Sequence, residues 1–156
     1  MKKKIAMMMM ALSLTFGVVG VPQTVFAASG STSVSVSSGR VNIGDTVTVT
    51  VKASGPSGEK ANATMTLSYD SSVLQFVSCN TTYGGGGGSV MATGESYTVT
   101  LKAVSAGNSS LSVSANDGVI FDSNEEMDSM SGSSASVTVK NAASTNKDSG
   151  NNSSSN

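Results

Sequence analysis

Residues 46–51 read Thr-Val-Thr-Val-Thr-Val, so polar and apolar side chains alternate with a strict period of two. Successive side chains of a β-strand point to opposite faces of a sheet, so this segment is expected to bury its valines and expose its threonines. The turn-forming pair Gly44 and Asp45 precedes it. A strand with one buried and one solvated face is typical of an antiparallel sheet.

The same alternation extends in both directions along the chain. It appears in residues 34–36, 62–69, 97–103, 111–115 and 137–139, with shorter strand candidates at 75–79, 89–91 and 119–122. Clusters of Gly, Asn and Ser separate these segments, and no ten-residue window has a convincing helical period. About eight or nine short strands with regular turn signals predict an all-β, antiparallel two-sheet sandwich of the jelly-roll or immunoglobulin-like kind.

Two of the strand candidates echo each other. Residues 44–53 and 94–103 are identical at six of ten positions, at an offset of fifty residues. A duplication would make this a repeat protein, whereas two strands that start from a Gly-acidic turn can converge on the same chemistry. We favour convergence, because the flanking residues do not match. In either case the echo marks two strand starts.

The composition excludes several functional classes. The 156 residues contain no His, which removes a Ser-His-Asp apparatus and imidazole metal ligands. A single Cys excludes an internal disulfide framework and a cysteine zinc site. A net charge of −1 gives no basic footprint for nucleic acid. The sequence therefore predicts a protein that is not an enzyme, with no catalytic residue, no metal site and no cofactor.

The N-terminus predicts export. Three lysines at positions 2–4 precede an apolar run over residues 5–21, and Val25-Phe26-Ala27 fits a signal-peptidase site. We expect a secretory signal peptide over residues 1–27, with cleavage after Ala28 as the alternative. The other alternative is a membrane anchor, since 17 apolar residues are near the lower limit for a span. Cleavage would change the net charge from −1 to −4, remove the membrane-inserting segment and place the protein outside the cell or at its surface.

The C-terminus predicts a tail. Ten of the sixteen residues in 141–156 are Ser or Asn, and none is an apolar residue larger than Ala. Such a segment cannot bury enough apolar surface to offset the entropy of ordering. We expect a disordered tail or linker, either in a released protein or in a chain shorter than its larger relatives. The folded domain is then expected over residues 31–140.

The weaker motifs each have a plain interpretation. Asp122, Asn124, Glu126 and Asp128 are spaced as in the first part of a calcium loop, but Met127 stands where Gly is needed, so a solvated acidic loop is favoured. The paired carboxylates Glu125 and Glu126 could in principle hydrolyse a glycoside. The domain has few of the aromatic side chains on which a glycosidase binds sugars, so this activity is not expected. The glycine run at 84–88 has no following Lys and predicts a hairpin tip, not a phosphate loop.

The single cysteine and the aromatic residues also have plain structural interpretations. Cys79 is expected to be a buried small hydrophobe, with an intermolecular disulfide as the alternative. Two or three of the aromatic residues in the domain are expected to fill the core. They are Tyr69, Phe76, Tyr83, Tyr97 and Phe121.

The most informative segment is 68–78, which reads Ser-Tyr-Asp-Ser-Ser-Val-Leu-Gln-Phe-Val-Ser. A strand ends at Tyr69, and the Asp70 carboxylate can cap one helical turn by accepting an amide proton of Ser72 or Val73. Leu74 is then expected to fill the core, and Phe76 to start the next strand.

This Tyr-Asp segment, with the valine strand upstream, resembles the cohesin family and related carbohydrate-binding-module sandwiches over residues 31–140. The resemblance implies an extracellular, non-catalytic sandwich of about nine strands. It also implies binding to dockerin modules of polysaccharide-degrading enzymes through one sheet face. Asp70, Leu74 and Phe76 correspond to fold residues, and no binding residue is transferred.

Three functions follow from these observations. The first is a cohesin-like module for protein attachment in extracellular polysaccharide-related assemblies, with a dockerin-like or other surface partner. The second is a carbohydrate-binding module, which the absence of Trp disfavours because sugar faces pack on aromatic rings. The third is a structural immunoglobulin-like spacer of a bacterial surface protein.

Overall fold

The computed structural model describes residues 28–121, 126–127 and 129–142. The predicted signal peptide, residues 143–156 of the predicted tail and most of the acidic loop lie outside the described residues. The described part contains eleven strands and one short 3-10 helix, η1 (Pro56–Gly58). The strands are β1 (Ser29–Val36), β2 (Arg40–Asn42), β3 (Thr46–Ser54), β4 (Ala61–Ser68), β5 (Leu74–Cys79), β6 (Ser89–Gly94), β7 (Ser96–Ala103), β8 (Gly107–Ile120), β9 (Glu126–Met127), β10 (Ser129–Ser131) and β11 (Ser133–Lys140).

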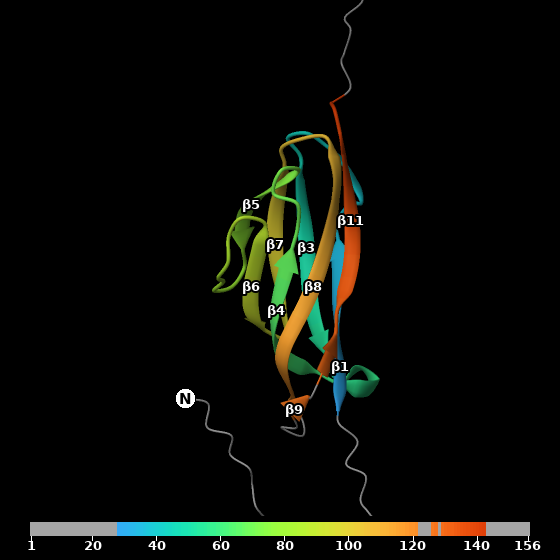
Figure 1. The fold of residues 1–156 in the computed structure, drawn as a ribbon, viewed down its shortest axis with the longest axis vertical. Coiled ribbons are helices and arrows are strands. Elements are labelled where there is room, and N and C mark those ends of the chain that lie inside the picture. Colours follow the sequence, from blue (N-terminus) through green and yellow to red (C-terminus); the bar gives the residue numbers. More distant parts are fainter. Residues whose placement is uncertain (1–27, 122–125, 128, 143–156) are drawn as a thin grey trace, which may run out of the picture.

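The strands form two sheets packed face to face, as the sequence predicted (Figure 1). One sheet, which we call sheet A, has five strands in the order β10-β1-β3-β7-β5. The other, sheet B, has six strands in the order β2-β11-β8-β4-β6, with β9 paired to β8. From β3 to β8 each successive strand lies in the opposite sheet, as in a jelly roll. Within the described residues no helix is long and apolar enough to cross a membrane.

The core sits between the two sheets and is made by the inward side of the period-two pattern. Val47, Val49 and Val51 of β3 are completely buried, while the threonines between them are exposed. The other inward-facing strands follow the same rule, including the Leu111 and Val113 pair of β8. Complete burial of a Val or Leu side chain contributes about 1.5–3 kcal/mol. The alternation in the sequence is therefore the main determinant of the fold.

The two segments that echo each other lie side by side. β3 and β7 are antiparallel neighbours, with Val49 opposite Val99 and Thr50 opposite Thr98. Both strand starts are confirmed, at Thr46 and Ser96. Each segment turns its hydroxyls outward and its apolar side chains toward the core. The two similar sequences therefore form two neighbouring strands of sheet A.

At each end of the folded region, two consecutive strands lie in different sheets. β1 lies in sheet A and β2 in sheet B; in the same way β10 lies in sheet A and β11 in sheet B. β1 pairs with β10 and β2 with β11, and these two pairings are parallel, whereas the other strand pairings in the described residues are antiparallel. The first and last strands of the described domain therefore close both sheets together.

Two details of the sequence-based prediction are wrong, and a third holds only locally. The structure has eleven strands, more than the eight or nine expected. Residues 119–120 are not a separate strand but the end of the long β8, where a register shift opposite Ala63 and Thr64 keeps the alternation in phase. The glycine run forms a local hairpin tip closed by the antiparallel bridge between Gly84 and Met91, but this hairpin does not join β5 to β6, because β5 belongs to sheet A and β6 to sheet B. It is part of a crossover between the edges of the two sheets.

The turn after β4 forms as the sequence predicted. The backbone amides of Val73 and Leu74 donate to the Asp70 carbonyl over 3.1 and 2.9 Å, which makes a single turn. The Ser72 amide donates to Asp70 Oδ1 over 2.9 Å. This turn carries the chain from sheet B to sheet A and delivers Leu74 into the core, completely buried, as the first residue of β5.

Only Tyr97, of the aromatic residues expected to fill the core, is fully buried. Tyr69 and Phe76 are half-buried, and Tyr83 and Phe121 are exposed. Tyr69 and Phe76 nevertheless pack against the core, so the expectation of two or three core aromatics holds only in part. Val, Leu, Ala and Met side chains fill most of the interior.

Tyr97 spans the core from β7 to sheet B. Its hydroxyl donates to the carbonyl oxygens of Met65 and Val90 over 3.2 and 3.3 Å. Burial raises the pKa of Tyr97 to about 12, above its ordinary value of 10.0. The folded protein therefore holds Tyr97 in its neutral form at a pH where the unfolded chain already ionises it.

Replacing Tyr97 by Phe is expected to lower the free energy of unfolding by about 1 kcal/mol at pH 8, because the hydroxyl bond is lost. The stabilising effect of the raised pKa is complete below pH 10.0 and is lost as the pH rises toward about 12. Wild type should thus lose more stability than Tyr97→Phe between pH 8 and 11. Urea unfolding at both pH values measures this, and equal losses would contradict it.

Candidate functional site

The outer side of sheet B over β4, β6 and β8 is a surface of mainly hydroxyl and amide side chains, which we call the hydroxyl face. It consists of the outward side chains of β4, β6 and the described outward positions of β8. These are Asn62, Thr64, Thr66, Ser68, Ser89, Met91, Thr93, Asn108, Ser110, Ser112, Ser114, Asn116 and Val119. Within β4 and β6, both fully described, no outward side chain carries a charge. Outside the hydroxyl face, on β2 and β11, the same side of the sheet carries the exposed cations Arg40 and Lys140.

The centre of the hydroxyl face is ordered by cross-strand pairs. Thr66 on β4 lies opposite Met91 on β6 and Ser114 on β8. One row away, the hydroxyls of Thr64 and Thr93 are hydrogen-bonded over 2.9 Å. Met91 is 45% exposed, an apolar side chain among hydroxyls. Cores of protein interfaces are depleted of charge and enriched in Met, so this composition suits protein contact.

The outer side of sheet A is also rich in threonine but carries cations. Lys102 on β7 lies opposite Thr46, and Lys52 on β3 lies opposite Ser96. These lysines are therefore near opposite ends of the same two strands. Between them, Thr100 lies opposite Thr48. The two outer faces thus share their hydroxyl rows. They differ in where the cations lie, because those of sheet A stand on its inner strands β3 and β7, whereas Arg40 and Lys140 of sheet B stand on β2 and β11, outside the hydroxyl face.

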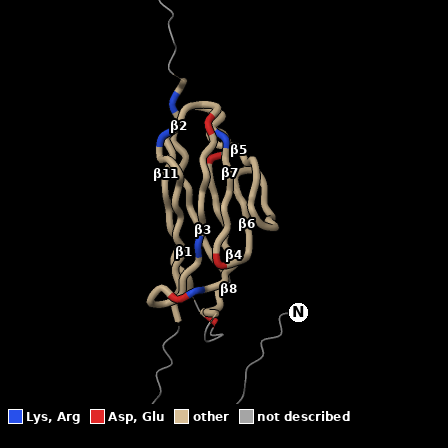
Figure 2. Tube along the Cα trace, turned by 180° about the vertical axis from the view of Figure 1, so that it is seen from behind, with Lys and Arg blue, Asp and Glu red and all other residues tan. Residues whose placement is uncertain are grey.

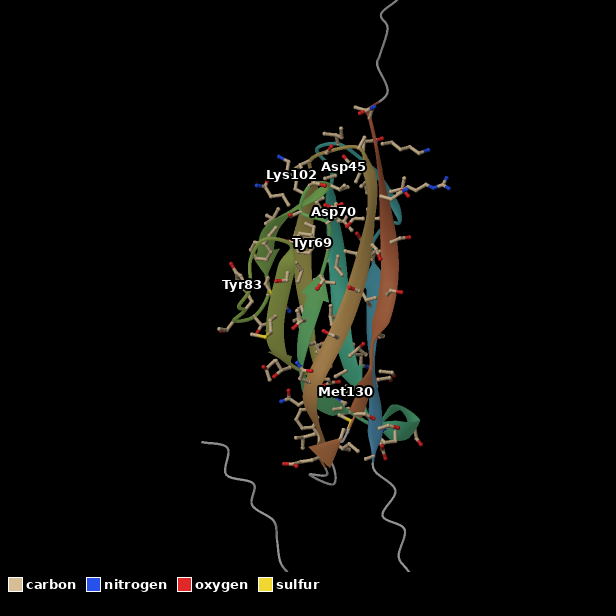
Figure 3. The ribbon with its side chains drawn as sticks, viewed as in Figure 1. Asp45, Tyr69, Asp70, Tyr83, Lys102 and Met130 are labelled. Atoms are coloured by element: carbon tan, nitrogen blue, oxygen red, sulfur yellow. The ribbon has the colours of Figure 1, made fainter. Side chains whose placement is uncertain are left out.

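Charged residues gather toward the two ends of the sandwich (Figure 2). Asp45, Asp70 and Lys102 are near the upper end in Figure 3. The Ser72 hydroxyl and backbone amide, 2.6 and 2.9 Å from Asp70 Oδ1, hold the pKa of that carboxyl below its ordinary value. Asp45 accepts a bond from the Asn42 amide over 2.8 Å. Both carboxylates thus organise turns.

A second feature lies at the open edge between β5 and β6. Residues 79–83 line an open hollow, which we call the edge hollow. The Tyr83 ring is 49% exposed and packs against Phe76, with ring centroids 4.8 Å apart and planes inclined by 43°. Figure 3 shows Tyr83 standing at this margin of the molecule. No sequence pattern marked Tyr83, because it lies among loop-forming residues.

The other residues considered from the sequence do not form a site. Cys79 is a free thiol with intermediate exposure, not the fully buried residue expected, and the intermolecular disulfide stays a prediction. Glu126 is exposed on β9, while Asp122, Asn124, Glu125 and Asp128 lie outside the described residues. In the ranges 28–121, 126–127 and 129–142, no three His, Cys, Asp or Glu residues are grouped to hold a metal ion.

The fold and its hydroxyl face describe a β-sandwich binding module. The sequence model of the cohesin domain matches residues 31–153, so the chain belongs to the cohesin domain family. Cohesin domains are non-catalytic binding modules. The match extends beyond residue 140, where we expected the domain to end. No curated protein sequence matches the chain.

Solved structures show the same fold at low sequence identity. The cohesin module of a family 33 glycoside hydrolase from Clostridium perfringens is 13% identical, with a TM-score of 0.57 over 72% of this chain and 98% of that one. CaCohA2, in a complex with CaDoc0917, is 18% identical, with a TM-score of 0.51 over 72% and 99%. A non-cellulosomal cohesin from the archaeon Archaeoglobus fulgidus is 13% identical, with a TM-score of 0.51 over 70% and 91%.

Proposed function

We propose that this protein is an extracellular attachment module that binds a dockerin-type partner through the hydroxyl face. The observation that carries the proposal is the absence of outward charge on β4 and β6, where Met91 of the edge strand β6 is exposed among hydroxyls. Family membership supports it, since cohesin domains bind dockerin modules. The attachment of polysaccharide-degrading enzymes is the setting we propose for this activity.

The chemistry of the face favours a protein partner. The row through Thr66, Met91 and Ser114 lies on three adjacent strands, so it offers a continuous surface with one apolar anchor. Hydroxyls can both donate and accept hydrogen bonds, which suits contact with peptide groups. Neither β4 nor β6 presents an outward charge that would have to be desolvated without a partner.

Export is the second part of the proposal. Residues 1–27 serve as the signal peptide, residues 31–140 as the sandwich and residues 141–156 as a Ser/Asn-rich linker. The uniform Ser and Thr surface agrees with an exposed extracellular module. N-terminal sequencing of the protein recovered from the culture medium is expected to begin at Ala28.

Replacing Thr66 by Arg is expected to weaken dockerin binding at least about tenfold, because an unpaired guanidinium would be buried at the interface. The binding partners are purified dockerin modules encoded in the same genome, and the measurement is isothermal titration calorimetry. Micromolar or tighter binding by at least one of them is expected for wild type, which is typical of specific protein recognition.

Thr100→Arg is the matched control. Thr66 and Thr100 are both partly exposed threonines on the strand next to the edge of their sheet, but they face opposite sides of the sandwich. Thr100→Arg should bind as wild type does. Equal weakening by both variants would contradict the assignment of the face. Failure of every dockerin to bind would contradict the partner and favour a structural spacer.

A further inference from the structure

The edge hollow combines polar side chains with an exposed aromatic ring, which are features of a small-ligand site that the hydroxyl face does not have together. Its wall is a short run of polar residues that ends in an exposed aromatic ring, Tyr83. Phe76 supports that ring from the side, and Phe76 is itself packed against the core. The Tyr83 ring is therefore in contact with Phe76 and keeps about half of its surface, 49%, open to a ligand.

The segment that carries Tyr83 is fixed at both ends by hydrogen bonds. At the start, the Asn80 amide donates to the Thr98 carbonyl over 3.1 Å, and the Thr98 amide donates to Asn80 Oδ1 over 2.7 Å. At the end, Gly84 and Met91 exchange two backbone bonds of 2.8 and 2.9 Å. A ring held this way loses little conformational freedom on binding, which favours affinity.

The polar groups of the hollow suit neutral ligands. Asn80 Oδ1 already accepts a bond from Thr98, so the side chain offers the hollow its amide donors. Thr81 and Thr82 are exposed and contribute hydroxyls that donate and accept. None of residues 79–83 is an acidic or basic residue. Hydroxyls, an amide and an aromatic face together match a sugar ring, which is polar at its rim and apolar on its C–H face.

We infer that the edge hollow binds a neutral polysaccharide chain, with Tyr83 stacking on a sugar ring and Asn80, Thr81 and Thr82 hydrogen-bonding to its hydroxyls. The hollow is open, so a chain can cross it without a free end having to enter. A protein partner is less suited, because specific protein interfaces bury about 800 Å² on each side around an apolar core. This site adjoins the hydroxyl face at the bridge between Gly84 and Met91 but uses different side chains.

Affinity electrophoresis of the full-length mature protein tests this inference. The gels contain hydroxyethylcellulose, xylan, mannan or soluble starch, and retardation by at least one of them is expected. Tyr83→Ala should weaken that retardation at least about tenfold because the stacking surface is removed, whereas Tyr83→Phe should retain most of it. Retardation in none of the four gels would overturn the inference.

Two further variants separate this site from other effects. Phe121→Ala removes an aromatic ring of similar exposure, 48%, directly after β8, and should leave retardation unchanged. Thr66→Arg should also leave it unchanged, even where it abolishes dockerin binding. Equal losses in Tyr83→Ala and Phe121→Ala would overturn the assignment. Loss of dockerin binding in Tyr83→Ala, with no retardation of wild type, would assign the hollow to the protein interface instead.

Discussion

Replacing Leu74 by Ala is expected to lower the free energy of unfolding by about 2–5 kcal/mol, the range found when a buried leucine is truncated. Leu74 is completely buried and is the first residue of β5, directly after the Asp70 turn. Its side chain packs between the edge of sheet A and sheet B. Truncation therefore leaves a cavity where the chain enters sheet A, and the rigid sheets on either side can collapse only in part.

Urea unfolding at pH 7 measures this loss, and Gln75→Ala is the matched control. Gln75 is the next residue of the same strand and is exposed, so its replacement should change the free energy of unfolding by less than about 0.5 kcal/mol. A loss below 1 kcal/mol in Leu74→Ala, or equal losses in the two variants, would show that the Tyr-Asp segment does not anchor the fold in this way.

The second large effect is expected within the glycine run. Replacing Gly88 by Ala should lower the free energy of unfolding by about 1–3 kcal/mol, the usual cost of a strained backbone conformation. Gly88 has φ = +100°, and an added Cβ would lie 2.7 Å from the Tyr69 carbonyl oxygen. The Gly88 carbonyl accepts the Tyr69 amide over 2.8 Å, so the backbone cannot move away without losing that bond.

Gly86→Ala is the control for this prediction. An added Cβ at Gly86 would have no neighbour within 4 Å, and its φ is not in the left-handed region. Alanine there should be neutral or stabilise by about 0.4–1 kcal/mol, because it restricts the unfolded chain. Thermal unfolding of both variants distinguishes them. Similar melting temperatures would mean that the run is a uniform spacer without individual roles.

The larger strands could be predicted from the sequence because each carries its own evidence. In β3 and β7 the alternation alone identifies the buried side, and every expected core valine is buried. The strands β2, β9 and β10 have only two or three residues each. A period cannot be recognised over so short a length. These strands exist because the long strands beside them offer unpaired backbone groups, which is a property of the tertiary fold.

The crossover at the glycine run shows the same limit. Glycine-rich residues between two strand candidates indicate a tight turn, and locally that interpretation is sound. Whether β5 and β6 pair with each other depends on their other neighbours. β5 pairs with β7 and β6 pairs with β4, so the two strands belong to different sheets.

The candidate sites were only partly accessible from the sequence. Hydroxyl rows could be predicted from the Ser and Thr positions, but both outer faces have them. The choice of the β4, β6 and β8 part of sheet B depends on which strands carry Lys52 and Lys102 in sheet A and Arg40 and Lys140 in sheet B, and therefore on strand order. The contact between Phe76 and Tyr83 joins an edge strand to a loop, and β5 has a register shift between Phe76 and Ser78. No local pattern encodes that geometry.

The parallel pairing of the terminal strands has a mechanical consequence. β1 begins at the lower pole of the sandwich and β11 ends at the upper pole, so the folded domain is entered and left at opposite ends (Figure 1). Tension along this axis would slide β1 against β10 and β2 against β11, across the direction of their hydrogen bonds. The bonds in each short ladder must then break together and not one after another. The terminal strand pairs are thus loaded in shear when the domain is stretched, a geometry that resists force better than one in which the hydrogen bonds open one at a time.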